Sequence, residues 1–246
     1  MSMAPERVTE SGPEGLRPGF ERVVHGLVPA AGSGQRFGGD TPKQFIEIAG
    51  RPLLAWTVER LVAAGVTSLT IAVPAEQIDL ARAIVDDERV LFVAGADTRQ
   101  GSVQVCLAGC PADPDELVLV HDGARPAVAS DDVAACIAAV GTHDGAVLGR
   151  SVSDTLKLVT GGEIQSTVDR SFLFRAETPQ VFPRELLERA LTEGDAAGFV
   201  GTDEASAVER LPGVRLAAVE ARHPNPKLTN PSDLALVRSL LVGSMN

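Results

Sequence analysis

Short apolar runs alternate with amphipathic stretches through the first half of the chain. Four runs rich in Val, Ile and Leu, each ending at Gly or Pro, predict buried strands at Val23–Pro29, Ser68–Pro74, Val90–Gly95 and Glu116–Gly123. The stretches between them have helical spacing and predict helices at Pro52–Ala64, Glu76–Val85 and Ser102–Gly109. Strands and helices that alternate in this way are typical of a parallel sheet covered on both faces. The pattern therefore predicts an α/β fold.

The second half departs from this alternation at Ser151–Arg170, where two extended segments flank Gly161-Gly162. Such a glycine pair is typical of a β-hairpin, so we expect a projecting arm at about residues 150–171. The later elements predicted are helices at Pro183–Leu191 and Asp203–Arg210, a strand at Arg215–Ala221 and a last helix from Pro231. The whole predicts one Rossmann-like domain over residues 21–246, with a mostly parallel sheet, helices on both faces and the projecting hairpin arm. Residues 1–20, rich in Pro, Gly and Glu, are expected to be a disordered tail.

Composition narrows the class of protein. The 246 residues are 44% hydrophobic, which suffices for one large domain with a buried core. The chain has neither the roughly 18 consecutive apolar residues of a membrane helix nor the apolar run of a signal peptide, so we expect a soluble, cytoplasmic protein without a membrane partner. A net charge of -11 argues against nucleic acid as a partner. The three cysteines and four histidines lack metal-ligand spacing, so we expect reduced, buried thiols and no histidine–metal site.

A glycine-rich segment, LVPAAGSGQRFGGDTPKQF at residues 27–45, follows the first predicted strand. In open α/β sheets the loop at the carboxyl end of this strand commonly cradles a phosphate. Glycines let backbone N–H groups approach phosphate oxygens, and Arg36 and Lys43 would supply positive charge. We interpret the segment as a phosphate-binding loop.

Three alternatives compete with this interpretation. A dinucleotide-binding G-x-G-x-x-G motif would begin at Gly32, but Phe37 occupies the position of its third glycine. A P-loop would begin at Gly34, but Asp40 occupies the position of its lysine. A glycine-rich turn without a ligand would leave the arginine and the lysine of the loop without a role.

Eight motifs follow one another along the chain: PAAGSGQRFGGDTPKQF, AGADTRQGSV, VHDGARP, SDTLK, TVDR, TPQVF, TDEASAVE and PKLTNPSDL. The first resembles the signature of the sugar-phosphate nucleotidyltransferase superfamily, and its Pro-Lys-Gln ending points to the cytidylyltransferase branch. Together, from about Val24, they are similar to the 2-C-methyl-D-erythritol 4-phosphate cytidylyltransferase family.

The resemblance implies an activity and an assembly. The activity is transfer of a cytidylyl group from CTP to the polyol phosphate 2-C-methyl-D-erythritol 4-phosphate. This gives 4-diphosphocytidyl-2-C-methyl-D-erythritol and pyrophosphate in non-mevalonate isoprenoid biosynthesis. The assembly is a homodimer in which the hairpin arm of one subunit completes the pocket of its partner. We also expect no fused cyclase domain of the kind that some relatives carry.

The resemblance also assigns nucleotide-binding residues. In the first motif, the backbone of Ala30, Ala31, Gly32 and Gly34 would hold the nucleotide. In the second motif, Gly95, Ala96, Asp97 and Ser102 would recognise cytosine. Gly123 of the third motif would lie beside them. Ser102 can equally be an ordinary residue at a helix N-terminus. Ala96 stands where the family has glycine, and alanine would be strained there if its φ is positive. The catalytic cations implied are Arg36, Lys43 and Lys227.

Asp122 ends the fourth predicted strand, where a carboxylate is a natural ligand for Mg²⁺ or another divalent cation, the expected cofactor. It could instead cap the turn that follows. Arg125 is expected either to reach the substrate phosphate or to orient Asp122. Lys157 is interpreted as a solvated residue of the arm. The polyol-phosphate residues implied by the resemblance are Asp122, Arg125, Thr155, Arg170, Thr178, Thr202, Asp203 and Lys227.

The expected reaction also requires fixed positive charge. In-line attack at the α-phosphorus spreads negative charge over the phosphate oxygens and the departing pyrophosphate, so fixed cations and Mg²⁺ carry most of the catalysis. The attacking group is a phosphate whose second pKa of about 6 leaves it ionised at pH 7, so no general base is expected. Two alternatives remain: a cytidylyltransferase for another polyol phosphate, such as ribitol 5-phosphate, and a nucleotide-sensing protein without turnover. The intact set of Arg36, Lys43, Asp122 and Lys227 argues against the second.

Overall fold

A computed structural model of the protein describes residues 22–32 and 42–243. The predicted tail at residues 1–20 lies outside this range, as do Gly34 and Arg36 of the glycine-rich loop. Within the described residues, no helix combines the length and the apolar character that crossing a membrane requires.

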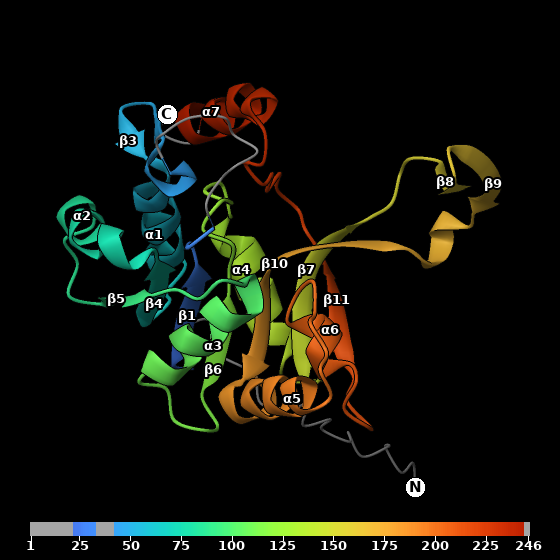
Figure 1. The fold of residues 1–246 in the computed structure, drawn as a ribbon, viewed down its shortest axis with the longest axis horizontal. Helices are drawn as coiled ribbons and strands as arrows, with labels where there is room; N and C mark the ends of the chain where they lie inside the picture. The colour runs from blue at the N-terminus through green and yellow to red at the C-terminus, as the bar shows by residue number, and fades with distance from the viewer. Residues whose placement is uncertain (1–21, 33–41, 244–246) are drawn as a thin grey trace, which may run out of the picture.

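Helices and strands alternate along most of the chain (Figure 1). The strands are β1 (Val24–Pro29), β2 (Glu47–Ile48), β3 (Arg51–Pro52), β4 (Ser68–Val73), β5 (Val90–Ala94), β6 (Leu117–Val120), β7 (Gly145–Ser151), β8 (Leu156–Thr160), β9 (Glu163–Val168), β10 (Phe174–Pro183) and β11 (Leu216–Glu220). The helices are α1 (Leu53–Ala63), α2 (Ile78–Ile84), α3 (Arg99–Gly109), α4 (Ser130–Ala139), α5 (Arg184–Ala196), α6 (Ala205–Val208) and α7 (Leu234–Gly243). Short 3-10 turns occupy Lys43–Phe45, Ala75–Gln77, Arg170–Phe172 and Pro231–Asp233.

The central sheet has seven strands in the order β11-β7-β10-β6-β1-β4-β5. β1 lies between β6 and β4 and is parallel to both, with Leu27 opposite Val120 and Thr70. β10 is antiparallel to its neighbours β6 and β7, whereas β11 pairs in parallel with β7. The sheet is therefore mostly parallel, as predicted. The carboxyl ends of β1, β4, β5 and β6 meet at one edge, where the loops that follow them can share a site.

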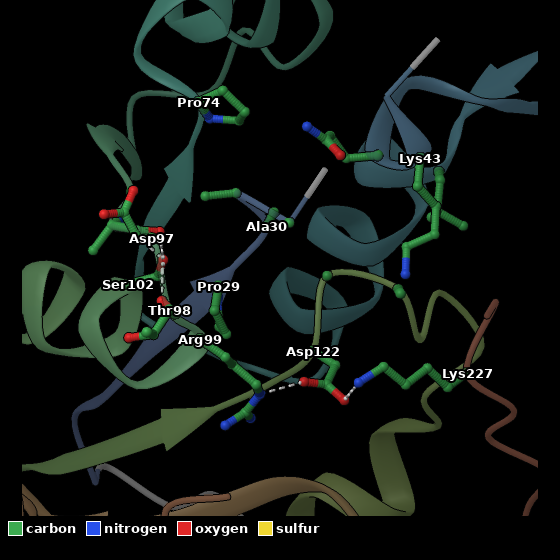
Figure 2. Close-up of a pocket in the computed structure, with 18 of the residues that line it drawn as sticks. Pro29, Ala30, Lys43, Pro74, Asp97, Thr98, Arg99, Ser102, Asp122 and Lys227 are labelled. Carbon is green, nitrogen blue, oxygen red and sulfur yellow. Dashed lines mark hydrogen bonds and ion pairs between the residues drawn. The ribbon is translucent and has the colours of Figure 1, made fainter. Parts of the chain in front are cut away.

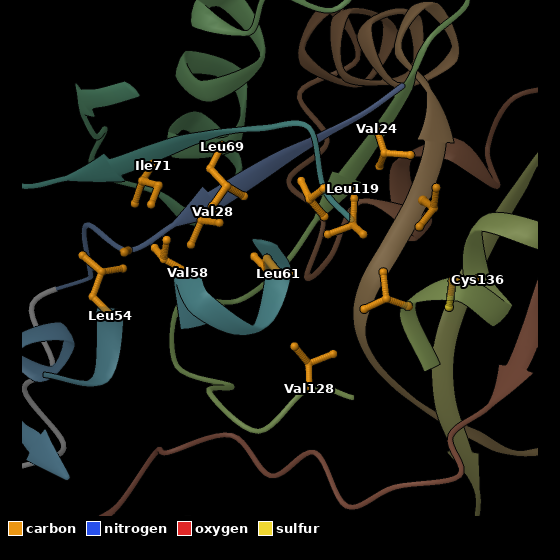
Figure 3. Packing of buried hydrophobic residues seen from close by; sticks show 14 of the residues in the cluster. Val24, Val28, Leu54, Val58, Leu61, Leu69, Ile71, Leu119, Val128 and Cys136 are labelled. Atoms are coloured by element: carbon orange, nitrogen blue, oxygen red, sulfur yellow. The ribbon is translucent and has the colours of Figure 1, made fainter. Parts of the chain in front are cut away.

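Alternate residues of the strands feed two apolar layers. Val24 and Val28 of β1 pack toward α1, α2 and α4, as Figure 3 shows for part of this cluster. Leu27 belongs to the opposite layer with α3, α5 and α6. Because successive side chains of a strand point to opposite faces, one apolar run can bury residues against both layers. Full burial of a side chain such as Leu27 contributes about 2 kcal/mol to the free energy of folding. The two apolar layers therefore stabilise the sheet, including the edge at which the carboxyl ends of β1, β4, β5 and β6 meet.

The predicted hairpin is present as β8 and β9, which pair only with each other and project from the sheet (Figure 1). Gly161 and Gly162 form its turn with φ of +60° and +84°, values that glycine adopts without strain. The arm leaves after β7 and returns to β10, two strands that pair with each other. It exposes large apolar side chains, with Ile164 66% and Phe172 87% accessible.

Some elements differ from the prediction. The pattern did not indicate β7, β10 or α4, although β10 supplies the antiparallel centre of the second half of the sheet. α3 begins at Arg99, earlier than expected, because the Thr98 side chain accepts the N–H of Gly101 and caps the helix. α5 runs on to Ala196, and α6 is shorter than the predicted helix. The prediction of reduced, buried cysteines is confirmed for all three thiols.

Candidate functional site

A cleft of about 930 Å³ lies at the carboxyl ends of the parallel strands (Figure 2). Its walls come from the loops after β1, β4, β5 and β6 and from the segment before α7. The lining residues are Pro29, Ala30, Ala31, Gly32, Lys43, Gln44, Leu53, Pro74, Ala75, Glu76, Gly95, Ala96, Asp97, Thr98, Arg99, Ser102, Asp122, Gly123, Ala124, Lys227 and Thr229. They include every predicted nucleotide-binding residue that the structure describes.

Two loops approach each other closely on one side of the cleft. A Cβ added at Gly95 would lie 2.2 Å from the Cβ of Ala31, which is far too close for any side chain. The loops are also tied to the sheet, because the N–H groups of Ala30 and Gly95 donate to carbonyls of β4 at 2.8 Å. A Cβ at Gly123 would meet Ala30 at 3.0 Å. Glycine at these positions therefore lets backbone approach backbone, as a nucleotide cradle requires.

Ser102 organises the loop before α3. Its hydroxyl accepts the N–H of Ala96 at 3.1 Å and lies 3.0 Å from the carbonyl of Thr98. The serine is buried, lies in the first turn of α3 and also lines the cleft, and its nucleotide-binding role stays a prediction. The strain considered for Ala96 is absent, because Ala49 is the one non-glycine residue with positive φ in the described parts of the chain.

Asp122 is the charged centre of the cleft. Lys227 Nζ lies 2.8 Å from its Oδ2, and Arg99 Nε lies 3.1 Å from its Oδ1, so each oxygen is hydrogen-bonded to a cation (Figure 2). Arg125 Nε is 3.5 Å from Oδ2. The backbone N–H of Asp122 donates to the hydroxyl of Thr178 at 3.0 Å. Three cations from separate parts of the chain thus converge on one carboxylate.

The charges around Asp122 set its ionisation. Burial opposes the charged carboxylate, but Arg99, Lys227 and Arg125 outweigh burial and hold the pKa of Asp122 well below its usual range. Burial likewise opposes the charge of Arg99, whose pKa is nevertheless raised by the carboxylates of Glu204 and Asp122. Asp122 and Arg99 are therefore both charged at neutral pH.

His121, next to this centre, is neutral. Burial lowers the pKa of its imidazole to about 4. Its Nε2 lies 2.9 Å from the carbonyl of Arg125, and its Nδ1 lies 3.1 Å from the hydroxyl of Thr178. His121 fixes the backbone around Asp122 and adds no charge.

Arg99 and Glu204 belong to this site although the sequence analysis assigned them no role. Arg99 donates to both oxygens of Glu204 at 2.7 and 3.0 Å, a two-point contact that fixes the guanidinium plane. Glu204 is almost completely buried. Both residues lie inside motifs already quoted, AGADTRQGSV and TDEASAVE. Their position in those motifs was the signal that could have identified them.

Several predicted polyol-phosphate residues lie outside the cleft. Thr178 is buried and holds the N–H of Asp122, and Asp203 accepts hydrogen bonds from Gln180 and Ser206 near α6. Thr202 is exposed and lines no part of the cleft. Thr155 and Arg170 lie on the arm, where the Arg170 guanidinium donates to the carbonyl of Ser153. The orienting role considered for Arg125 matches its contacts with Asp122 and with the carbonyl of Asn225.

The carboxylates that line the cleft are Glu76, Asp97 and Asp122. In the described parts of the chain, no group of three or more His, Cys, Asp or Glu residues could by itself hold a metal ion. This arrangement does not exclude Mg²⁺, which is commonly bound by one or two carboxylates together with substrate phosphates. Asp122, at the end of β6, is the carboxylate closest to the converging cations and fits that donor set.

Comparison with known proteins gives one consistent result. The profile of the family described as 2-C-methyl-D-erythritol 4-phosphate cytidylyltransferase matches residues 24–242. Proteins of that name from Aeromonas hydrophila and Ralstonia nicotianae are 43% and 39% identical to the chain. The alignments cover 90% and 93% of this chain and 89% and 94% of those proteins. The crystal structure of the Thermus thermophilus protein of the same name is 32% identical, with a TM-score of 0.75 over 90% of this chain and 98% of that chain.

Proposed function

Since the chain belongs to the 2-C-methyl-D-erythritol 4-phosphate cytidylyltransferase family, we propose that it transfers the cytidylyl group of CTP to this polyol phosphate in the cleft around Asp122. The observation that carries this assignment is the convergence of Arg99, Lys227 and Arg125 on one buried carboxylate beside the glycine-rich loop. Anionic substrates that enter such a cleft meet fixed cations instead of a hydrophobic wall.

CTP occupies the cleft with its phosphates over the loop after β1 and its base at the loop before α3. The cleft volume of about 930 Å³ is ample for a nucleoside triphosphate. Backbone groups of Ala30 to Gly32 contact the phosphates, and Lys43 faces the same space (Figure 2). Backbone groups at Gly95 and Ala96, held by Ser102, read the exocyclic groups of cytosine.

The reaction needs positioning and charge more than acid–base chemistry. An oxygen of the polyol phosphate attacks the α-phosphorus of CTP, a new P–O bond forms, and the bond to the β-phosphate oxygen breaks to release pyrophosphate. The nucleophile is already anionic at pH 7, since a phosphate monoester has a second pKa of about 6. Lys43 and Lys227, with Arg36 of the loop, stabilise the charge that grows on the non-bridging and leaving oxygens. Neutral His121 takes no proton in this scheme.

A divalent cation fits the cleft through Asp122 and the phosphates. When bound, Mg²⁺ neutralises phosphate charge and polarises the α-phosphorus. Asp122 would hold it with one oxygen. Lys227, which is 39% exposed, can turn from Asp122 toward a phosphate. Arg99 keeps the other oxygen fixed, because it is itself held by Glu204.

The arm suits a twofold homodimer. Its exposed apolar side chains, including Leu158, Ile164 and Phe172, are of the kind that a second copy would cover. Thr155 and Arg170, assigned to the polyol phosphate, lie on the arm, which projects from the sheet (Figure 1), and neither lines the cleft of its own chain. Exchange of arms would bring these two residues to the cleft of the partner.

Mixed dimers test the exchange. Lys43→Ala and Arg170→Ala each damage one contribution, so a mixed dimer would contain one intact pocket and one doubly damaged pocket. Equal mixing should make about half the dimers mixed, and about a quarter of all pockets should regain activity. The variants are refolded together and pyrophosphate release is measured per subunit. Activity no higher than the average of the separate variants, despite proven subunit exchange, would show that Arg170 does not serve the partner.

Pyrophosphate release from CTP tests the function itself. The purified chain is assayed with 2-C-methyl-D-erythritol 4-phosphate, with ribitol 5-phosphate and with no acceptor. We expect rapid release only with the first acceptor, and none when CTP is replaced by UTP. Faster turnover with ribitol 5-phosphate would change the assigned acceptor, and nucleotide binding without turnover on either would indicate a sensing protein.

A further inference from the structure

A second hollow, of about 470 Å³, lies at the root of the arm and shares Arg125 and Lys227 with the catalytic region. Its charged lining also includes Glu177 of β10 and two more arginines, Arg150 of β7 and Arg175 of β10. None of these three residues takes part in the scheme above. Glu177 has a side chain only 4% exposed, so a reason is needed for placing a carboxylate there.

Glu177 is surrounded by arginines from three parts of the chain. Its Oε1 accepts from Arg175 Nη2 at 3.1 Å and lies 3.7 Å from Arg150 Nε. Its Oε2 lies 3.7 Å from Arg125 Nη1. Oε1 accepts one hydrogen bond, whereas Oε2 has no hydrogen-bond partner among the described residues, so Arg125 and Arg150 act on the buried carboxylate through their charge. One negative charge therefore holds three guanidinium groups that would otherwise repel one another.

Two of these arginines also hold the segment that leads to Lys227. Arg125 Nη1 donates to the carbonyl of Asn225 at 2.7 Å, and Arg150 donates to the carbonyl of His223. The side chain of Asn225 in turn donates to the carbonyl of Thr178 at 2.7 Å. The backbone from His223 to Asn225 is thus fixed from two sides, two residues before Lys227.

We propose that Glu177 is a positioning residue for cytidylyl transfer, which aligns Lys227 through Arg125 and Arg150. The carboxylate orients the two guanidinium groups, and these hold the carbonyls of residues 223 and 225. The backbone from which the Lys227 side chain extends toward Asp122 is thereby fixed, while the ammonium itself can still turn to a phosphate. The inference rests on the proposed function, because it assigns Lys227 to the charge that develops during transfer.

The expected effect is on turnover more than on nucleotide affinity. Glu177→Gln keeps the shape of the side chain but removes the charge that gathers the arginines. A displacement of about 1 Å in a catalytic group can cost up to ~100-fold in rate, so we expect kcat to fall roughly 10- to 100-fold. The KM for CTP should change by less than about 3-fold, because the Gly95 side of the cleft does not contact this cluster.

A double-mutant cycle separates positioning from general stability. Glu177→Gln is combined with Lys227→Ala, and pyrophosphate release is measured for both single variants and the double variant. If Glu177 acts through Lys227, the glutamine should cost less than about 3-fold once Lys227 is absent. Equal losses in both backgrounds would overturn the proposal. So would a lower melting temperature with unchanged kcat.

Matched variants keep the test decisive. Glu116→Gln removes a carboxylate whose Oε2 lies 3.1 Å from His25 Nε2 at the opposite end of β6, and it should leave kcat unchanged. Glu177→Asp retains the charge and should recover part of the loss. If Glu177→Gln does not fold, Arg150→Gln takes its place in the cycle with the same expected non-additivity. No turnover by the wild-type chain would overturn the proposed function, whereas wild-type turnover with an additive cycle overturns only the role of Glu177.

Discussion

Asp122→Asn separates what the central carboxylate does for the fold from what it does for the reaction. The asparagine keeps nearly the same shape but removes the negative charge that faces Arg99 at 3.1 Å and Lys227 at 2.8 Å. Asp122 has a side chain only 9% exposed, so water cannot replace that charge. The variant leaves cations gathered around a neutral group.

The cost in stability follows from the contacts. Removing one partner of a buried ion pair costs about 3–5 kcal/mol. We expect the lower end, about 3 kcal/mol, because Arg99 keeps its two-point contact with Glu204 and the ammonium of Lys227 can turn to solvent. For a chain of this size that corresponds to a decrease in melting temperature of about 6–12 °C.

The dependence on pH has a defined sign. The pKa of Asp122 is depressed in the folded state, so its contribution to stability is present above the unfolded pKa of about 3.9 and is lost as the pH falls below it. The difference in stability between wild type and Asp122→Asn should therefore be constant from pH 5 to 8. It should shrink in more acidic solution.

Two assays on the same variant decide the matter. Thermal unfolding gives the stability, and pyrophosphate release across a Mg²⁺ titration gives the reaction. Activity should fall steeply and be partly recovered at much higher Mg²⁺, because the amide retains one oxygen ligand without the charge. Asp132→Asn is the control, because the Asp132 side chain is even more deeply buried and accepts the N–H groups of Arg222 and His223. This variant should lose stability yet keep the Mg²⁺ dependence. Normal Mg²⁺ dependence in Asp122→Asn would place the metal elsewhere, and undiminished stability would refute the electrostatic reasoning.

The remaining predictions concern single side chains. Lys43→Ala and Arg36→Ala should each lower kcat by roughly 10²–10³-fold, by analogy with loss of a preorganised hydrogen-bond donor to an oxyanion. Steady-state kinetics with CTP varied check this, and a change in KM alone would contradict it. Arg99→Lys cannot reach Glu204 and Asp122 with one ammonium, so urea unfolding should show a loss of about 2 kcal/mol, and an unchanged midpoint would count against the bridge. Burial raises the pKa of Cys106 and Cys136 to about 12, so iodoacetamide at pH 8 should label these thiols only after unfolding. Labelling of the native chain at the rate of a free thiol would be incompatible with that burial.

The first half of the sheet was predictable because buried parallel strands consist of continuous apolar runs. β1, β4, β5 and β6 each contain such a run, and the structure has all four within a residue or a few of the expected bounds. The cleft was predictable for a related reason. The loops at the carboxyl ends of these strands are brought together by the parallel topology itself, and the glycine-rich loop is one of them.

β10 could not be found in this way. Its middle contains Glu177, Thr178 and Gln180, three polar residues that are at least 95% buried. Each has a partner far away in sequence: Arg125 and Arg150 for the glutamate, the N–H of Asp122 for the threonine, Asp203 for the glutamine. Val181 and Phe182 of β10 are fully buried, but two apolar residues after a polar stretch are too short a run to indicate a strand. The partners of the polar residues become visible only in three dimensions.

The bridge between Arg99 and Glu204 escaped prediction for the same physical reason, since 105 positions separate the two residues. The local sequence pattern indicates which face of a helix or strand is buried. The pairing of charged side chains depends instead on the tertiary arrangement of the helices and strands. The cations of the glycine-rich loop were predictable because they stand beside a recognisable backbone motif. Arg99 was not predictable, because its role depends on a carboxylate that lies far along the chain.

The net charge of -11 is unfavourable for binding anionic substrates, and the cations around Asp122 and Glu177 counter it locally. A strongly acidic protein has to bind two highly anionic substrates, and the overall field opposes their approach. In the described residues, Arg99, Arg125 and Lys227 gather around Asp122, while Arg150 and Arg175 gather with Arg125 around Glu177. Five cations thus share the three carboxylates of Asp122, Glu204 and Glu177, so positive charge is in excess within this cluster. The carboxylates keep the cations aligned before a phosphate arrives, and less reorganisation is needed when it binds. A variant that lacks one of these carboxylates has a more positive cluster. It should nevertheless turn over more slowly, because the rate depends on how the cations are aligned and not on how much positive charge is present.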